Sequence, residues 1–166
     1  EHLGAGVELD RAGVHLVHHL LVGAEQELLP RLAPGVEGAR HLGTTEGAAY
    51  LDGSGWTTVE IPDEAGSNFV TSILPASDGA VWFGRQDAGV SRLCRGEWTT
   101  FTPAKGFIHP RVNALAETTN PDGRPIIWAG THGAGLAKFE DGKWTVLNHK
   151  DGLPDDRIWR LYPARA

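Results

Sequence analysis

Short apolar runs recur along the chain, and each is followed by glycine or by an Asp-Gly pair. In the clearest stretch, 111–148, the runs are RVNALAE, IIWAGT, LAKF and WTVLN, separated by turns around Asp122-Gly123, 133–135 and Asp141-Gly142. Asp-Gly between apolar runs is a strong hairpin signal, because glycine readily adopts the positive φ that a two-residue turn requires. The pattern therefore predicts a unit of four short antiparallel strands.

The same unit recurs along the whole chain. One glycine of the unit returns at Gly6, Gly47, Gly89 and Gly135, at intervals of 41, 42 and 46 residues. Three further columns keep these intervals: His15, Trp56, Trp98, Trp144; then Leu29, Val70, Val112, Ile158; then Leu32, Ile73, Leu115, Leu161. A fixed period of this size indicates a repeat architecture. We predict one domain, 1–166, made of copies at 1–40, 41–81, 82–127 and 128–166.

Units of 41 to 46 residues with four strands each match the blades of a β-propeller, so the predicted class is all-β. The recurring Trp and Phe side chains are predicted to pack between blades, where their large apolar surfaces replace a single core. Helical repeats of similar period would have to run through the glycine-rich turns, which disfavour helix.

The two ends of the chain fall at neighbouring positions of the repeat. Glu1 aligns with Gly84 and Ala166 with Asp78, so four copies are present except for the stretch equivalent to 79–83. A ring closed by these ends would lack the second strand of its closing blade and would leave backbone groups unpaired. We therefore expect an arc of about four blades from a larger propeller, with a closed four-bladed ring as the alternative.

The copies resemble two-component regulator propeller repeats, whose pattern includes W-x-G-T, a G-G-L step, a D-G turn, a following tryptophan and D-G-L-P. The last copy carries most of this pattern, at Trp128, Gly130, Thr131, Gly135, Leu136, Asp141, Gly142, Trp144, Asp151, Gly152, Leu153 and Pro154. The resemblance implies an extracytoplasmic or periplasmic sensor domain of a bacterial signalling protein, often a hybrid histidine kinase that detects saccharides or other small molecules. It also implies that further blades belong to a parent chain.

The charge of the chain argues against two classes of partner. The net charge is −6 and the pI is near 5.7, which argues against nucleic acid and against an anionic membrane surface as partners. No apolar run approaches the roughly 20 residues of a spanning helix. Cys94 is the single cysteine, so an intrachain disulfide is excluded.

Familiar catalytic and cofactor motifs are absent from the sequence. The GAG steps at 4–6 and 133–135 lack the third glycine of a dinucleotide cradle and are explained as turns of the repeat. In HLVHHL, the adjacent His18 and His19 would point to opposite faces of a strand and could not chelate one ion together. Asp155 and Asp156 are interpreted as part of a polar turn. We therefore predict no cofactor, no metal and no enzymatic activity.

Binding residues are expected on the first strand of each copy and on the loop leading into it, because ligands of propellers usually bind in the channel and at its mouth. A repeated scaffold supplies rigidity while variable side chains supply specificity. In this region Trp159, the one tryptophan outside a repeat column, is predicted to stack on a sugar ring beside arginines that bind hydroxyls or a carboxylate. The alternative is that Trp159 packs under a blade and the arginines are solvated. The predicted ligand-binding residues are Asn68, Arg111, Asn113, Arg157, Trp159 and Arg160.

Taken together, the sequence favours a non-enzymatic propeller segment that binds a small molecule or a protein partner. One alternative is a propeller lyase that opens cyclic peptide antibiotics, since such enzymes share a DGxxWF step resembling DGAVWFG at 78–84. A lyase should place a His and a Glu near the channel with a divalent metal. The other alternative is a purely architectural module that has no small-molecule site.

Overall fold

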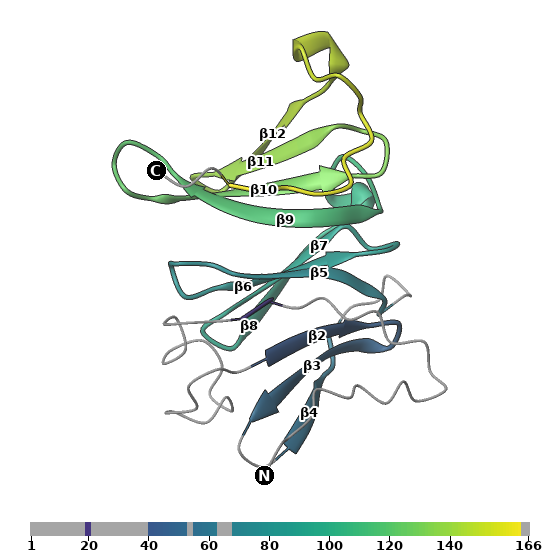
Figure 1. Ribbon diagram of the computed structural model, residues 1–166, viewed down its shortest axis with the longest axis vertical. Coiled ribbons are helices and arrows are strands. Elements are labelled where there is room, and N and C mark those ends of the chain that lie inside the picture. The colour runs from purple at the N-terminus through teal and green to yellow at the C-terminus, as the bar shows by residue number, and fades with distance from the viewer. Residues whose placement is uncertain (1–18, 21–39, 53–54, 63–67, 164–166) are drawn as a thin grey trace.

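Three four-stranded antiparallel sheets make up the computed structural model, which describes residues 19–20, 40–52, 55–62 and 68–163. Figure 1 shows them stacked one after another along the long axis of the molecule. The first sheet contains β1 (His19–Leu20), β2 (Arg40–Thr44), β3 (Gly47–Asp52) and β4 (Gly55–Val59). The second contains β5 (Val70–Pro75), β6 (Val81–Arg85), β7 (Val90–Cys94) and β8 (Glu97–Phe101). The third contains β9 (Val112–Thr119), β10 (Pro125–Thr131), β11 (Leu136–Glu140) and β12 (Lys143–Leu147).

Within each sheet the strands follow one another in chain order, as the blades of a propeller do. Two short 3₁₀ helices, η1 (Pro103–Lys105) and η2 (His149–Asp151), lie in the connections that leave β8 and β12. The all-β class and the unit of four antiparallel strands, both predicted from the sequence, are confirmed.

The hairpins form where the sequence places glycine. In the β7–β8 turn Arg95 and Gly96 have φ of 52° and 83°, and in the β11–β12 turn Asp141 and Gly142 have φ of 49° and 80°. Two successive positive φ values are the geometry of a type I′ turn, whose twist matches that of the flanking strands. Local sequence therefore decides where each strand reverses.

The first sheet differs from the pattern of the other two. Its first strand, β1, pairs with β2 through His19↔His41 and Leu20↔Arg40. The repeat columns instead assigned the first strand to 25–32, which lies outside the described residues, as do Leu29 and Leu32. The first copy lacks most of the diagnostic residues, so the alignment of its columns depended on spacing alone.

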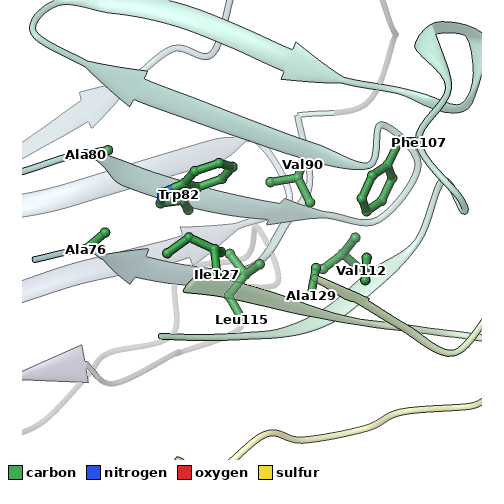
Figure 2. Close-up of a cluster of buried hydrophobic side chains, with 10 residues drawn as sticks. Ala76, Ala80, Trp82, Val90, Phe107, Val112, Leu115, Ile127 and Ala129 are labelled. Atoms are coloured by element: carbon green, nitrogen blue, oxygen red, sulfur yellow. The ribbon is translucent and has the colours of Figure 1, made fainter. Parts of the chain in front are cut away.

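Apolar side chains fill the space between the second and third sheets. Trp82, Val90 and Phe107 meet Ile127 and Ala129 of β10 in one buried cluster, and Trp82 is only 1% exposed. Figure 2 shows Trp82 together with Val90, Val112 and Ile127 in this cluster. A second cluster, containing Ala48, Ile61, Val70, Phe83 and Leu93, joins the first and second sheets. Burial between sheets thus takes the place of a central core.

Trp98 and Trp144 confirm the packing between blades expected for their column, whereas Trp56 does not. Trp144 of β12 stands edge-on to Trp82 and to Phe101 of the second sheet, with ring centroids 6.1 and 5.6 Å apart. Trp98 packs against the cluster between the first and second sheets. Trp56, in the same column, is 53% exposed. The three sheets form an arc. The alternative of a closed four-bladed ring depends on the part of the chain that begins at Glu1, which lies outside the described residues.

Candidate functional site

Residues 157–162, which follow η2, pack against the third sheet in the way that the first strand of a next blade would. They belong to none of the three sheets of the described residues. Gly130 lies against Ile158 so closely that a Cβ there would be 2.6 Å from its Cγ2. The backbone N–H of Ile158 donates to the carbonyl of Thr131 at 2.8 Å, and the amide of Asn113 donates to the carbonyl of Ile158 at 2.8 Å. In Figure 1 the segment is the yellow trace that runs beside β9 and β10.

The same contacts occur one blade earlier, between the second sheet and the start of β9. The comparison shows which strand position residues 157–162 occupy. Gly84 lies against Val112, and the Thr71 hydroxyl donates to the carbonyl of Val112. Gly89 donates its N–H to the carbonyl of Pro110 at 2.7 Å, just as Gly135 donates to the carbonyl of Asp156 at 2.8 Å. Residues 157–162 therefore occupy the place that β9 occupies beside the second sheet, so they form the first strand position of a further blade.

Asp156 and its neighbours give the loop leading to this segment a defined shape. The Asp156 carboxylate accepts from the backbone N–H of His149 at 2.7 Å and contacts Nδ1 of the same residue at 2.5 Å. This hydrogen bond to His149 is the main reason that the pKa of Asp156 is lowered. Asn148 and Asp151 form a capping box around η2. Asp155 accepts the backbone N–H of Arg157 at 2.7 Å. The two aspartates that the sequence analysis interpreted as part of a polar turn thus both stabilise the conformation of this loop.

A histidine that the sequence analysis did not select lies at the centre of the residues brought together here. His132 follows β10, and its ring stands edge-on to Trp159, with centroids 5.2 Å apart and planes at 88°. The amide nitrogen of Asn113 is 3.4 Å from Nδ1 of His132. Partial burial lowers the pKa of His132, and the nearby positive charges of Arg111 and Arg157 lower it further.

His109 is the second histidine that the sequence analysis missed. Its Nδ1 accepts the backbone N–H of Arg111 at 3.0 Å, so a neutral His109 carries its proton on Nε2. His109 also lowers the pKa of His132. Neither histidine stands in a repeat column; the detectable signal was their position in the variable segments FIHPR and GTHGA.

We call the resulting group the rim cluster. It comprises His109, Arg111, Asn113, His132, Arg157 and Trp159. Its members come from the connection into β9, from β9 itself, from the β10–β11 loop and from the segment after η2. These lie at the edge of the arc opposite the β9–β10 hairpin turn (Figure 1).

Four of the six predicted ligand residues belong to the rim cluster, and two do not. Trp159 is 59% exposed, the side chain of Arg157 is exposed, and Arg111 is half-buried. Asn113 is committed to the Ile158 carbonyl and so orients the neighbouring segment. Asn68 lies one blade earlier and accepts from Nη2 of Arg85 at 3.4 Å. Arg160 donates to the Tyr162 hydroxyl at 3.4 Å, a contact that raises its pKa.

The cluster offers guanidinium and imidazole donors beside an accessible indole. Such a set can bind oxygen atoms and stack on a ring. Within the described ranges, no three His, Cys, Asp or Glu side chains lie close enough together to hold a metal ion. No helix in those ranges is long and apolar enough to cross a membrane.

Comparison with known proteins gives matches among solved structures. No family model matches the sequence, and no curated protein matches it. One similar structure is the extracellular domain assigned to the hybrid two component system BT4673 from B. thetaiotaomicron, with 19% identity, a TM-score of 0.59 and coverage of 75% of this chain and 17% of that one. A second structure of the BT4673 extracellular domain, assigned there to a one component system, gives 22% identity, a TM-score of 0.59 and the same coverage.

The extracellular domain assigned to the hybrid two component system BT3049 from the same organism is also similar. The match has 18% identity and a TM-score of 0.63, and it covers 91% of this chain and 20% of that one. The chain thus spans a fifth or less of the length of these domains. At such identities the likeness establishes a shared fold, and the resemblance to two-component regulator propeller repeats is confirmed at that level.

Proposed function

We propose that the chain is part of a non-enzymatic, ligand-sensing propeller of an extracytoplasmic signalling protein, and that the rim cluster contacts the ligand. The fold shared with extracellular domains assigned to two component and one component systems supports the setting. The observation that carries the binding proposal is the exposed indole of Trp159. It packs against the ring of His132, and Arg111 and Arg157 lie near that histidine.

The ligand in this proposal is a small molecule, of which a saccharide is the first candidate. An indole face packs well on the C–H face of a sugar ring, while guanidinium groups donate to its oxygens. Arg111, Arg157 and Trp159 make the direct contacts. Asn113 positions the segment that carries Trp159, and Asn68 and Arg160 flank the site for a larger ligand or a protein partner. Nucleic acid and membrane are not partners in this proposal.

The location of the cluster suggests how binding is communicated. Arg111 and His132 adjoin strands of the third sheet, at the start of β9 and at the end of β10, whereas Arg157 and Trp159 belong to the first strand position of a further blade. A ligand held by both groups stabilises one arrangement of the two blades over others. Because a ligand shifts an equilibrium only through its differential affinity for the two states, a site that bridges blades is suited to signalling.

Isothermal titration calorimetry with the protein and four sugars (glucose, galactose, glucuronate and galacturonate) tests the proposal. We expect saturable binding of at least one sugar, and we expect Trp159→Ala to weaken it about tenfold because the stacking surface is lost. Trp56→Ala is the matched control, since Trp56 is also exposed but lies outside the cluster. The absence of saturable heat for all four sugars, or an equal loss in both variants, would contradict the proposal.

A further inference from the structure

Two arginines and a histidine from separate segments lie together in the rim cluster. Arg111 precedes β9, His132 follows β10, and Arg157 follows η2. The chain as a whole carries a net charge of −6, so this gathering is not the by-product of a basic surface. The charges of Arg111 and Arg157 both disfavour further positive charge at His132, and a bound anion would offset them.

No ion pair in the described ranges involves the guanidinium group of Arg111 or of Arg157. The ion pairs there involve Arg92, Arg124, Lys138 and His149, none of which is in the cluster. Two aspartates lie nearby in the chain, but Asp155 accepts the backbone N–H of Arg157 and Asp156 is bonded to His149. The guanidinium groups of Arg111 and Arg157 therefore have no carboxylate partner among the described residues.

Arg111 also has an unused donor. Its Nε is buried and has no hydrogen-bond acceptor. Buried polar atoms without a partner are uncommon in folded proteins and cost free energy, so each one requires an explanation. No acceptor in the described ranges therefore holds the Arg111 side chain through its Nε.

The orientation of Trp159 leaves a flat surface beside the positive groups. Its ring meets His132 at 88°, so the two rings touch edge to face, and 59% of the residue remains exposed. A six-membered sugar ring can lie on the indole while a substituent of the ring reaches the guanidinium groups.

We propose that the rim cluster binds a sugar acid, with the carboxylate held by Arg111 and Arg157 and the sugar ring stacked on Trp159. This inference rests on the proposed function and specifies its ligand class. Arginine suits the role because its planar fork matches the two oxygens of a carboxylate.

Matched sugars distinguish the contribution of the ligand's carboxylate to binding from the contribution of its sugar ring. The affinity of the protein is measured by calorimetry for glucuronate and galacturonate, for their uncharged methyl esters, and for glucose and galactose. We expect at least one acid to bind about tenfold or more tightly than its ester and its parent sugar, since a charge-assisted hydrogen bond is roughly twice as strong as a neutral one. The advantage of the acid should shrink as salt increases.

Variants of the protein then test which arginines bind the carboxylate of the ligand. Arg157→Gln should lower the affinity for the acid about tenfold and the affinity for the neutral sugar by a clearly smaller factor, and Arg111→Gln should do the same. The first variant is the cleaner one, because the Arg157 side chain is exposed whereas that of Arg111 is half-buried. Lys143→Gln, an exposed lysine next to the β11–β12 turn at the opposite edge, is the control. Thermal unfolding of each variant checks that the fold is retained.

The outcomes distinguish this inference from the function on which it rests. Equal affinity for acid and ester, or a stronger effect of Lys143→Gln than of Arg157→Gln, would overturn the sugar-acid inference while leaving a sugar site at the cluster. Failure of both acids and both neutral sugars to bind would overturn the two together.

Discussion

At the scale of single residues, glycine is required where the β6–β7 turn packs against the end of β8 and the connection that follows it. Gly89 has φ of 71° and donates its N–H to the carbonyl of Pro110. A Cβ at this position would overlap the carbonyl oxygen of Phe101 and press on the ring of Phe107. The recurring glycine column therefore reflects two demands at one position: a left-handed backbone and the lack of space for a side chain.

Gly89→Ala should destabilise the protein by about 4 kcal/mol, since the strained φ and the overlap with Phe101 each contribute a few kcal/mol. Gly142→Ala is the matched control, because Gly142 has φ of 80° but no atom within 4 Å of an added Cβ. It should cost only about 1 to 2 kcal/mol, from the backbone alone. Urea unfolding measures both, and equal losses would show that the close contact at Gly89 is unimportant.

His132 gives the rim cluster a pH dependence of defined sign. Its pKa is lowered in the folded protein by partial burial and by the charges of Arg111 and Arg157, with His109 adding to the effect. The unfolded chain therefore binds the proton more readily, and stability should fall as the pH drops below the ordinary histidine range near about 6.5.

Thermal unfolding between pH 5 and 7.5 measures this effect, and His132→Asn should make the dependence shallower. Affinity for a sugar acid should change in the opposite direction, rising as the pH falls, because a carboxylate favours the imidazolium form. A His132→Asn variant with unchanged pH dependence in both measurements would show that His132 does not titrate in this range.

At the scale of secondary-structure elements, packing between sheets contributes what a single core contributes in other folds. Trp144 contacts four aromatic rings, those of Trp82, Phe101, Phe107 and Phe139, with centroids 4.9 to 6.1 Å apart. A further tie between sheets is polar: the backbone N–H of Leu115 donates to the Ser72 hydroxyl at 3.1 Å in a buried setting. Aromatic packing and hydrogen bonding thus both join the second and third sheets.

Trp144→Ala should destabilise the protein by about 3 kcal/mol, because a large aromatic side chain is lost from the contact between two sheets. Trp56 occupies the same column in the first sheet but is 53% exposed, so Trp56→Ala should cost less than about 1 kcal/mol. Guanidinium unfolding of the two variants makes the comparison. A larger loss for Trp56 than for Trp144 would contradict the assignment of that column to packing between blades.

At the scale of the whole molecule, the described residues form three blades and the first strand position of another. Residues 157–162 contact Gly130, Thr131 and Asn113, as Val112 contacts Gly84 and Thr71. The rim cluster lies across this junction, with members on both sides of it. In the proposed sensor, the ligand therefore acts on the contact between blades, which is the contact that holds a propeller together.

The sequence by itself determined the number of strands in a unit, the positions of the turns and the spacing of the glycine and tryptophan columns. These features depend on local chemistry that repeats: a glycine at a positive φ, an Asp-Gly turn, and apolar residues at fixed steps. The first strand of the first sheet was placed differently, because the first copy retains the spacing but few of the residues that specify a strand.

Only the tertiary structure decided which variable residues lie together in the rim cluster. Arg111, His132 and Arg157 are separated by 21 and 25 positions, and no local pattern relates them. They meet because each follows or precedes a strand at the same edge of the arc. The structure also divided the predicted residues by role: it left Trp159 exposed on His132 and turned Asn113 toward the Ile158 carbonyl. The repeated residues built the scaffold, and the packing of successive blades brought the variable residues together.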